Sequence, residues 1–486
     1  MDKIHHIPNV CIEKYHKSKD YSFRISGMRS IFAAKKMETT LSKNELQLSC
    51  ERLRPLFLRY ALPGVGAMLF LALQSIADGL IVGRLIGATA LAAVNIVIPI
   101  YTLVTAVALM IGVGTQAQIG IRMGRGDYSG AKTALISGLV GLLFFTGTTT
   151  VGVNIFADEI AVFLGADNEL LPLSTKYIHG LMPWLAGIGF QLLFDYMLKA
   201  LGHPRFAMTV MIGTILLNIV SSVICVSYLG MGTFGTGLGT GMSFTLGAVV
   251  SGYVIVKQLR KNTELYTVHG RFSLKTFGHL FYNGSSEGLT EISTGVTVFL
   301  FNITLMKYVG AAGVAAFTLV DYLMFIGTSV ILGISNGTIP IISYNWGARC
   351  MPRVKGIVRL ALAGNLVCGA VMIFLLWVCG HAAVGLFIDS AESQVIDLAV
   401  RGARFMSLAF LFNGFNILAS SFFTAIDKPG LSLVVASLRG PVLLVSGILS
   451  LPRWFGVDGI WLAMPLADAL TAVIVLWLVL KWKKRL

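Results

Sequence analysis

Twelve long apolar segments follow a polar stretch at the start of the chain. They lie at about 56–80, 90–120, 132–155, 177–200, 206–228, 236–257, 284–306, 314–343, 356–378, 400–425, 430–450 and 457–480. A helix needs about 20 predominantly apolar residues to cross a bilayer, and each segment reaches that length. The pattern predicts an all-α polytopic membrane protein with twelve transmembrane helices.

The composition agrees with this prediction. Hydrophobic residues make up 55% of the chain, charged residues make up 13%, and the mean hydropathy is +0.78. These values exclude an ordinary soluble globular protein and leave no room for a large soluble domain. The six cysteines form no C-x-x-C motif and do not cluster with histidines, so we expect no metal site and no cofactor other than a coupling ion.

Short motifs recur in the two halves of the chain. The stretch LIGATALAAVN at 85–95 resembles YVGAAGVAAFT at 308–318. Three further pairs recur at offsets of 223 to 225 residues: Gly124 with Gly347, LGHP (201–204) with IDKP (426–429), and Gly232 with Gly456. The repeat predicts two homologous six-helix bundles of the same orientation, which is a common transporter architecture.

The loops and the tail complete the predicted organisation. We expect a disordered cytoplasmic tail at 1–50, an N-terminal bundle at 51–260, a basic cytoplasmic linker at 261–282 and a C-terminal bundle at 283–486. With both termini in the cytoplasm, 31 of the 38 Lys and Arg residues fall inside, as the positive-inside rule requires. The net charge of +15 therefore reflects membrane orientation, and we expect no nucleic-acid partner.

Asp78 is the strongest candidate for function. It is the only carboxylate in the first apolar segment, and an acid at the centre of a bilayer costs about 2.5–3.5 kcal/mol on insertion scales. Gln74 lies one turn earlier on the same helix face. Pro63 removes a backbone hydrogen bond from the same helix and favours a bend there. The alternative is that Asp78 pairs with the headgroup region or caps the next element.

Two further groups of polar residues lie within the spans. In the first, Gln191 and Asp195 share a face of the fourth span, and Asn218 lies in the middle of the fifth. Two structural alternatives remain for this group: an exposed ion pair between Asp195 and Lys199, and a helix–helix hydrogen bond made by Asn218.

The second group lies in the C-terminal half. Glu287 and Glu291 are one turn apart in the seventh span, and Asn302 follows three turns later. Two carboxylates at this spacing repel each other when both are ionised, which favours binding of a proton or a cation. Weaker candidates share an apolar setting: Asp321, Asn336, Asn413, Asn416, Arg439 and Asp468. The sequence assigns no counter-ion to Arg439.

Several enzyme-like motifs lack the context that their chemistry needs. The glycines at 230–235 satisfy G-x-G-x-x-G, and 333–337 satisfies G-x-S-x-G, but both lie in membrane helices or their turns and follow no strand. No P-loop motif occurs, and no catalytic dyad or metal set stands within the spans. We therefore expect that the protein is not an enzyme.

Several of these motifs also identify a resemblance. The stretches IADGLIVGRLIG, RMGRGD, LGHP and GISNGTIPIISYNWGAR (333–349) resemble the multidrug and toxic compound extrusion (MATE) transporters over about 51–486. NGSSE, at the start of the seventh span, is similar to the MepA-like bacterial branch. The resemblance implies a monomeric exporter in the bacterial inner membrane, with two bundles in a V. It would exchange drugs or other amphiphilic organic cations for H⁺ or Na⁺.

The resemblance also implies roles for single residues. Asp78 matches the first-helix aspartate that takes up the coupling cation in DinF-like members, Pro63 matches the hinge proline, and Asn218 matches an asparagine of the same cavity. Ser222 and Asn413 stand where related members carry acids, which leaves the coupling ion open.

The predicted site therefore has three parts. The coupling group is Asp78, Asn218 and Asp195, and Pro63 is the hinge. The predicted substrate cavity consists of Gln74, Gln191, Glu291, Asn302 and Asn413.

The predicted mechanism is antiport by alternating access. A proton or Na⁺ at Asp78 removes the negative charge that a cationic substrate needs, so each ligand displaces the other. The alternative within the same superfamily is a flippase for lipid-linked precursors, which would need cationic residues in its cavity, and only Arg439 is a candidate. A channel is a second alternative.

Overall fold

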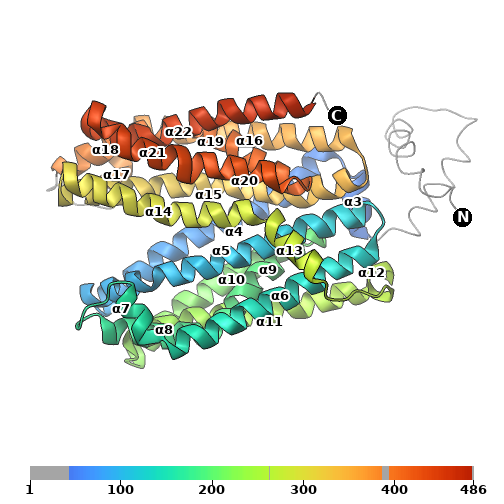
Figure 1. The fold of residues 1–486 in the computed structure, drawn as a ribbon, viewed down its shortest axis with the longest axis horizontal. Helices are drawn as coiled ribbons and strands as arrows, with labels where there is room; N and C mark the ends of the chain where they lie inside the picture. The colour runs from blue at the N-terminus through green and yellow to red at the C-terminus, as the bar shows by residue number, and fades with distance from the viewer. Residues whose placement is uncertain (1–42, 262, 386–392, 484–486) are drawn as a thin grey trace, which may run out of the picture.

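The computed structural model describes residues 43–261, 263–385 and 393–483, and every regular element in these ranges is a helix. The helices form two bundles that lie side by side (Figure 1). Eleven of the described helices are long and apolar enough to cross a membrane. A shorter apolar helix, Phe410–Ala425, supplies the twelfth span, so the predicted all-α fold with twelve spans is confirmed.

The N-terminal bundle holds the first six spans. Their elements are α4 (Leu53–Leu85), α5 (Ala88–Gly124), α6 (Tyr128–Ile155), α8 (Leu171–Leu181) with η1 (Met182–Trp184) and α9 (Leu185–Ala200), α10 (Pro204–Val223) with the π-helical turn η2 (Ile224–Tyr228), and α11 (Gly232–Lys261). The short helix α7 (Ala157–Phe163) lies between α6 and α8.

The C-terminal bundle holds the other six. Its elements are α14 (Ser285–Tyr308), α15 (Ala311–Gly347), α16 (Met351–Val378), α18 (Ser393–Ser407) with α19 (Phe410–Ala425), α20 (Pro429–Ser437) with the π-helical turn η3 (Leu438–Val442) and α21 (Leu443–Ser450), and α22 (Pro452–Lys483). The short helix α17 (Gly380–Gly385) corresponds to α7. Between the bundles, α12 (Thr263–Thr267) and α13 (Leu274–Asn283) form the connection.

The two bundles repeat the same backbone. Helices α5 and α15 are both 37 residues long, and each follows a glycine with positive φ, Gly87 at 126° and Gly310 at 84°. Positive φ recurs at three further pairs of equivalent positions: Gly126 with Arg349, Gly202 with Asp427, and Gly232 with Gly456. Such turns favour glycine, so the repeat detected in the sequence is a repeat of turn geometry.

Small residues let the bundles touch at one end. A Cβ atom on Gly64 of α4 would lie 2.3 Å from the carbonyl oxygen of Gly333 on α15. Likewise, a Cβ atom on Gly124 of α5 would lie 2.1 Å from the carbonyl oxygen of Tyr344. Close backbone approach at small residues is a usual way for membrane helices to pack. The bundles therefore meet tightly along α4, α5 and α15.

The helix α3 (Lys43–Cys50) corrects part of the predicted tail. The sequence analysis placed these residues in a disordered segment, but they form a helix in which Glu45 is 0% and Leu48 is 2% exposed. One buried leucine in eight residues gives no periodic signal, which is why the helix was missed. Residues 1–42 of the predicted tail lie outside the described residues.

Candidate functional site

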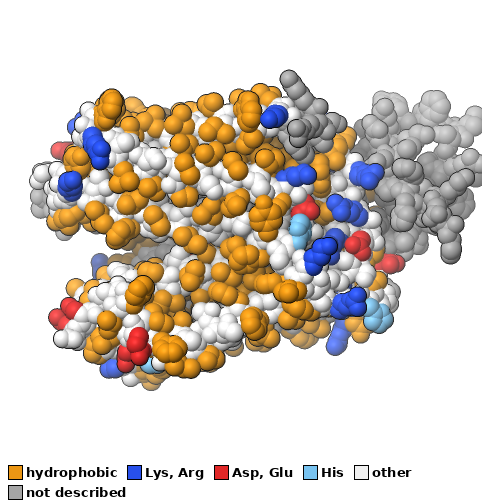
Figure 2. Space-filling view, viewed as in Figure 1, with side chains coloured by type: hydrophobic (Ala, Val, Ile, Leu, Met, Phe, Trp, Pro, Cys, Tyr) orange, Lys and Arg blue, Asp and Glu red, His pale blue; other side chains and the backbone are white. Residues whose placement is uncertain are grey.

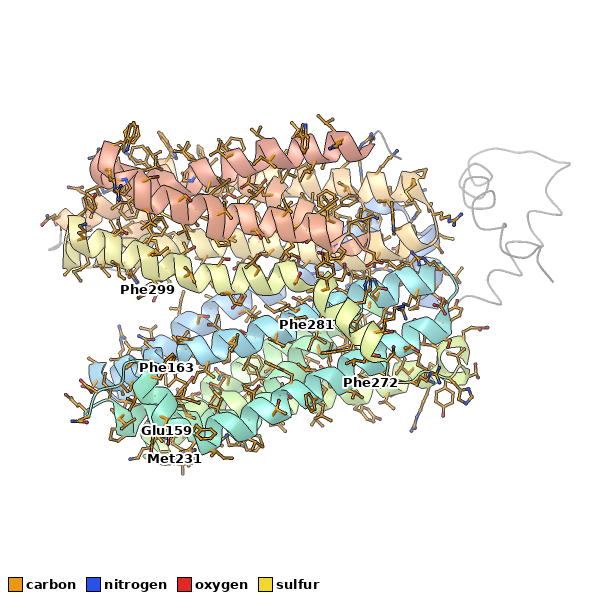
Figure 3. All side chains as sticks on the ribbon, viewed as in Figure 1. Glu159, Phe163, Met231, Phe272, Phe281 and Phe299 are labelled. Carbon is orange, nitrogen blue, oxygen red and sulfur yellow. The ribbon has the colours of Figure 1, made fainter. Side chains whose placement is uncertain are left out.

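A cavity of 480 Å³ lies between the two bundles. Its walls come from α4, α5, α8, α9, α10 and α11 on one side and from α14 and α15 on the other. Figure 2 shows a hollow between the bundles at the end near α7, which we call the α7 end; the opposite end carries α3 and is called the α3 end. Phe299 of α14 and Phe163 of α7, both exposed, lie on facing bundles at the α7 end (Figure 3).

Asp78 lies on the N-terminal wall of this cavity. Gln74, one turn earlier on α4, donates a hydrogen bond from Nε2 to Asp78 Oδ2 at 3.4 Å. Gln74 is 6% exposed, and its own Oε1 has no hydrogen-bond partner among the described residues. The structure therefore brings together a carboxylate and an acceptor oxygen that is free to bind a donor or a cation.

The C-terminal wall carries two more carboxylates. Glu287 and Glu291 of α14 both line the cavity. Glu287 is hydrogen-bonded to Asn336 of α15, and Ser421 of α19 donates to Asn336 Oδ1 at 3.0 Å. Acids therefore stand on both walls, in both halves of the repeat.

Asp195 also lines the cavity, but it is already paired. Lys199, one turn later on α9, donates to Asp195 Oδ2, and each residue is 3% exposed. The exposed ion pair that was the alternative to a coupling role for Asp195 does form, but it is buried. Because Lys199 compensates the charge of Asp195, this carboxylate attracts an incoming cation less than Asp78 does.

Four of the predicted coupling and substrate-cavity residues are not among those that line the cavity. Asn218, 0% exposed, donates from Nδ2 to Thr240 Oγ1 at 2.8 Å, and Thr240 is a lining residue. Gln191 accepts a hydrogen bond from Ser251 at 3.3 Å behind the same wall. These two residues contact residues of the wall and do not themselves line the cavity in this conformation.

The other two lie in the C-terminal bundle. Asn413 is 0% exposed and neither of its amide atoms has a partner among the described residues, while Asn302 Oδ1 is buried without one. Pro63 is buried inside α4, which is helical on both sides of it, so a bend at Pro63 remains a prediction.

Aromatic residues of the cavity were missed by the sequence analysis. The lining includes Tyr101, Tyr177, Tyr196, Phe244 and Phe325. Aromatic faces bind organic cations through cation–π attraction and also accept apolar groups. Because tyrosine and phenylalanine are common in any membrane helix, only the tertiary structure identifies those that face the cavity.

The structure supplies the missing counter-ion of Arg439. Its Nε donates to Asp468 Oδ1 at 2.9 Å inside the C-terminal bundle, and Asn416 Nδ2 donates to the same oxygen at 3.1 Å. All three residues were weak candidates from the sequence, and the fold joins them into one group that is not part of the cavity lining.

Comparison with known proteins gives a consistent result. The profile of the MatE family matches residues 63–224 and 289–447, which is more than half of the chain. "Multidrug export protein MepA" of Staphylococcus aureus (strain MSSA476) is 23% identical over 437 residues, with 88% of this chain and 94% of the relative covered. The MepA protein of Staphylococcus saprophyticus is 23% identical over 433 residues, with the same shares covered.

Solved structures share the fold. "Crystal structure of MATE in complex with MaL6" superposes with a TM-score of 0.83 at 23% identity, covering 90% of this chain and 98% of the other. "Outward-facing conformation of a multidrug resistance MATE family transporter of the MOP superfamily" superposes at 0.82 with 22% identity, covering 90% and 97%. With the family profile matching both halves, the chain belongs to the MatE family and is a MepA-like MATE transporter.

Proposed function

We propose that this protein is a secondary active antiporter that exports drugs or other amphiphilic organic cations in exchange for H⁺ or Na⁺. The observation that carries the proposal is the charge of the cavity. Asp78, Glu287 and Glu291 face it from the two walls, and no Lys or Arg is among the described residues that line it. Tyrosine faces and the flexible side chains of Met68 and Met211 add surfaces that suit varied cations.

The same observation distinguishes two candidate substrates. A flippase for lipid-linked precursors must hold a pyrophosphate, which requires cationic side chains. Arg439, the one candidate from the sequence, is instead bound to Asp468 outside the cavity lining. The cavity thus favours cationic over anionic substrates.

The two ends of the molecule support alternating access. Lys and Arg side chains gather at the α3 end (Figure 2), and under the positive-inside rule this supports a cytoplasmic location for that end and for both termini. The tight contact of α4 and α5 with α15 closes the cavity on this side, and the cleft opens at the outer, α7 end. We further propose that the protein acts as a monomer in the bacterial inner membrane, without a cofactor.

The coupling follows from competition for one negative charge. Asp78 with a bound proton or Na⁺ no longer offers that charge to a cationic substrate, so entry of the ion from outside favours substrate release. A coupling free energy of about 1–3 kcal/mol is typical of such linkage.

Reconstitution into proteoliposomes tests the proposal. Protein that is inserted inside-out in the proteoliposomes would transport dyes into the lumen. The proteoliposomes receive an imposed pH or Na⁺ gradient and a panel of quaternary ammonium dyes, and a lipid-linked pyrophosphate is the competing substrate. We expect one gradient to drive uphill accumulation of the dyes. Downhill flux alone would indicate a channel, and movement of the lipid-linked compound alone would indicate a flippase.

A further inference from the structure

Helix α3 contacts both bundles at the α3 end, which is unexpected for the last turns of a polar tail. We propose that α3 is a clasp that joins the two bundles and holds the cytoplasmic side of the cavity closed. Its release would then be a required step in opening the cavity to the cytoplasm. The role in opening rests on the proposed alternating-access function, whereas the clasp itself rests on the contacts described next.

The contact with the N-terminal bundle is a partly buried hydrogen bond. Tyr128, the first residue of α6, donates from its hydroxyl to Glu45 Oε1 at 2.9 Å. Glu45 is 0% exposed, and Ser49 donates from Oγ to the Glu45 carbonyl oxygen at 2.7 Å. A carboxylate removed from water in this way needs such a donor, so the position of α3 against α6 is specified.

The contact with the C-terminal bundle is made by the last turn of α3. The carbonyl oxygen of Leu48 accepts from Asn345 Nδ2 at 3.1 Å and from Arg353 Nη2 at 3.0 Å. Arg353 Nε also donates to Asn345 Oδ1 at 3.1 Å, which fixes the two donors relative to each other. The last carbonyls of a helix lack intrahelical donors, and a cation at this end is also favoured by the helix dipole.

The side chain of Leu48 completes the junction. It is 2% exposed and belongs to a buried core that also contains Met123 of α5 and Tyr344 of α15. The apolar contact is therefore shared between the bundles, like the polar contacts on either side of it.

These contacts cannot all persist when the bundles separate. Tyr128 belongs to the N-terminal bundle, and Asn345 and Arg353 belong to the C-terminal one. Because α3 is followed directly by α4, it stays with the N-terminal bundle and must leave Asn345 and Arg353 as the cavity opens to the cytoplasm. An isolated helix of eight residues is not stable in water, so α3 binds or releases as a unit.

Two substitutions on α3 distinguish the effect of undocking the helix from the effect of an added negative charge. Leu48→Asp places a carboxylate in the buried junction and is expected to undock α3 without altering either bundle. Gln47→Asp adds the same charge at a half-buried position next to it and is the matched control. Spin labels at two exposed positions, Arg125→Cys after α5 and Lys355→Cys on α16, report the cytoplasmic distance between the bundles in a background without native cysteines.

Double electron–electron resonance (DEER) measures the distance between the two spin labels. We expect the distances between the labels at positions 125 and 355 to become longer in Leu48→Asp and to stay unchanged in Gln47→Asp. Tyr128→Phe, which removes one hydroxyl, should give a smaller shift in the same direction and serves if Leu48→Asp does not fold. Folded Leu48→Asp and Tyr128→Phe proteins with the parent's distances would overturn the clasp, as would an equal shift in Gln47→Asp.

The distance measurement needs no substrate and no ion gradient. Its result therefore tests the clasp independently of the proposed transport function. If the distances shift but the protein transports no organic cation, the clasp is supported and the antiport proposal is contradicted. If the protein exchanges cations normally but the distances do not shift, only the clasp is contradicted.

Discussion

Arg439 of η3 and Asp468 of α22 form a buried ion pair within the C-terminal bundle, with 2.9 Å between Nε and Oδ1. The side chains are 18% and 2% exposed. Arg439 is carried by a π-helical turn, an irregularity that often accompanies functional positions in helices. Neither residue lines the cavity, so the pair does not contact a substrate bound there in this conformation.

Removal of one member of this pair should destabilise the protein strongly. Arg439→Met leaves the Asp468 carboxylate buried with Asn416 as its one remaining side-chain donor among the described residues, and breaking such pairs costs about 3–5 kcal/mol. We expect a clear decrease of the melting temperature in detergent. The double variant Arg439→Met/Asp468→Leu should recover most of this loss, and a double variant no more stable than the single one would contradict the explanation.

Asp78→Asn should abolish ion-coupled export while the amount of protein in the membrane stays normal. The amide keeps the size of the side chain and its hydrogen bond with Gln74, but it can neither take up a proton nor bring a negative charge to the cavity. Efflux driven by a pH or Na⁺ gradient in vesicles is the measurement. Glu159→Gln is the control, because Glu159 is an exposed acid of α7 outside the cavity lining (Figure 3).

Gly333→Ala should weaken the contact between α4 and α15. The new Cβ would lie 2.5 Å from both N and Cα of Val65, so the two backbones must move apart. Overpacking of this kind costs about 1–3 kcal/mol. We expect a lower melting temperature and longer distances between the bundles at the α3 end.

Gly213→Ala on α10 provides the control for that substitution, because a Cβ there meets no atom within 4 Å. It should leave stability unchanged or raise it slightly, since alanine favours a helix over glycine by about 1 kcal/mol. Equal losses in both variants would show that the effect comes from helical glycines in general.

The sequence was sufficient for the parts of this structure that depend on local pattern. Apolar segments of sufficient length specify the helices, and the repeat places glycines such as Gly87 and Gly310 at equivalent turns. Asp78 could be proposed as a candidate because a carboxylate in an apolar helix is costly wherever the helix lies in the bundle, and it lies on the cavity wall.

The parts that the sequence did not reveal depend on contacts between distant residues. The partner of Arg439 is 29 residues away on another helix, and nothing in the sequence specifies that pairing. Gln191 faces Ser251 instead of the cavity, because the rotation of a helix is set by its neighbours and not by its own polar residues. The docking of α3 likewise depends on Asn345 and Arg353, about 300 residues later in the chain.

Asp427 occupies a left-handed turn in the C-terminal half, and Gly202 occupies the equivalent turn in the N-terminal half. The φ of 63° at Asp427 is unusual for a residue with a side chain, whereas Gly202 adopts 88° freely. The carboxylate compensates by accepting hydrogen bonds at Oδ1 from Gln118 Nε2 at 2.8 Å and at the same distance from His279 Nε2. Asp427 thereby connects the loop before α20 to α5 and α13.

Three substitutions at Asp427 separate the backbone from the side chain. Asparagine tolerates positive φ and keeps a hydrogen-bond acceptor, so the melting temperature of Asp427→Asn should stay near that of the parent protein. Gly loses the acceptor but relaxes the backbone, and Ala loses the acceptor while keeping a strained conformation that costs about 1–2 kcal/mol. We therefore expect the order of stability to be Asn, then Gly, then Ala. If Ala were as stable as Gly, the left-handed turn at Asp427 would not be strained.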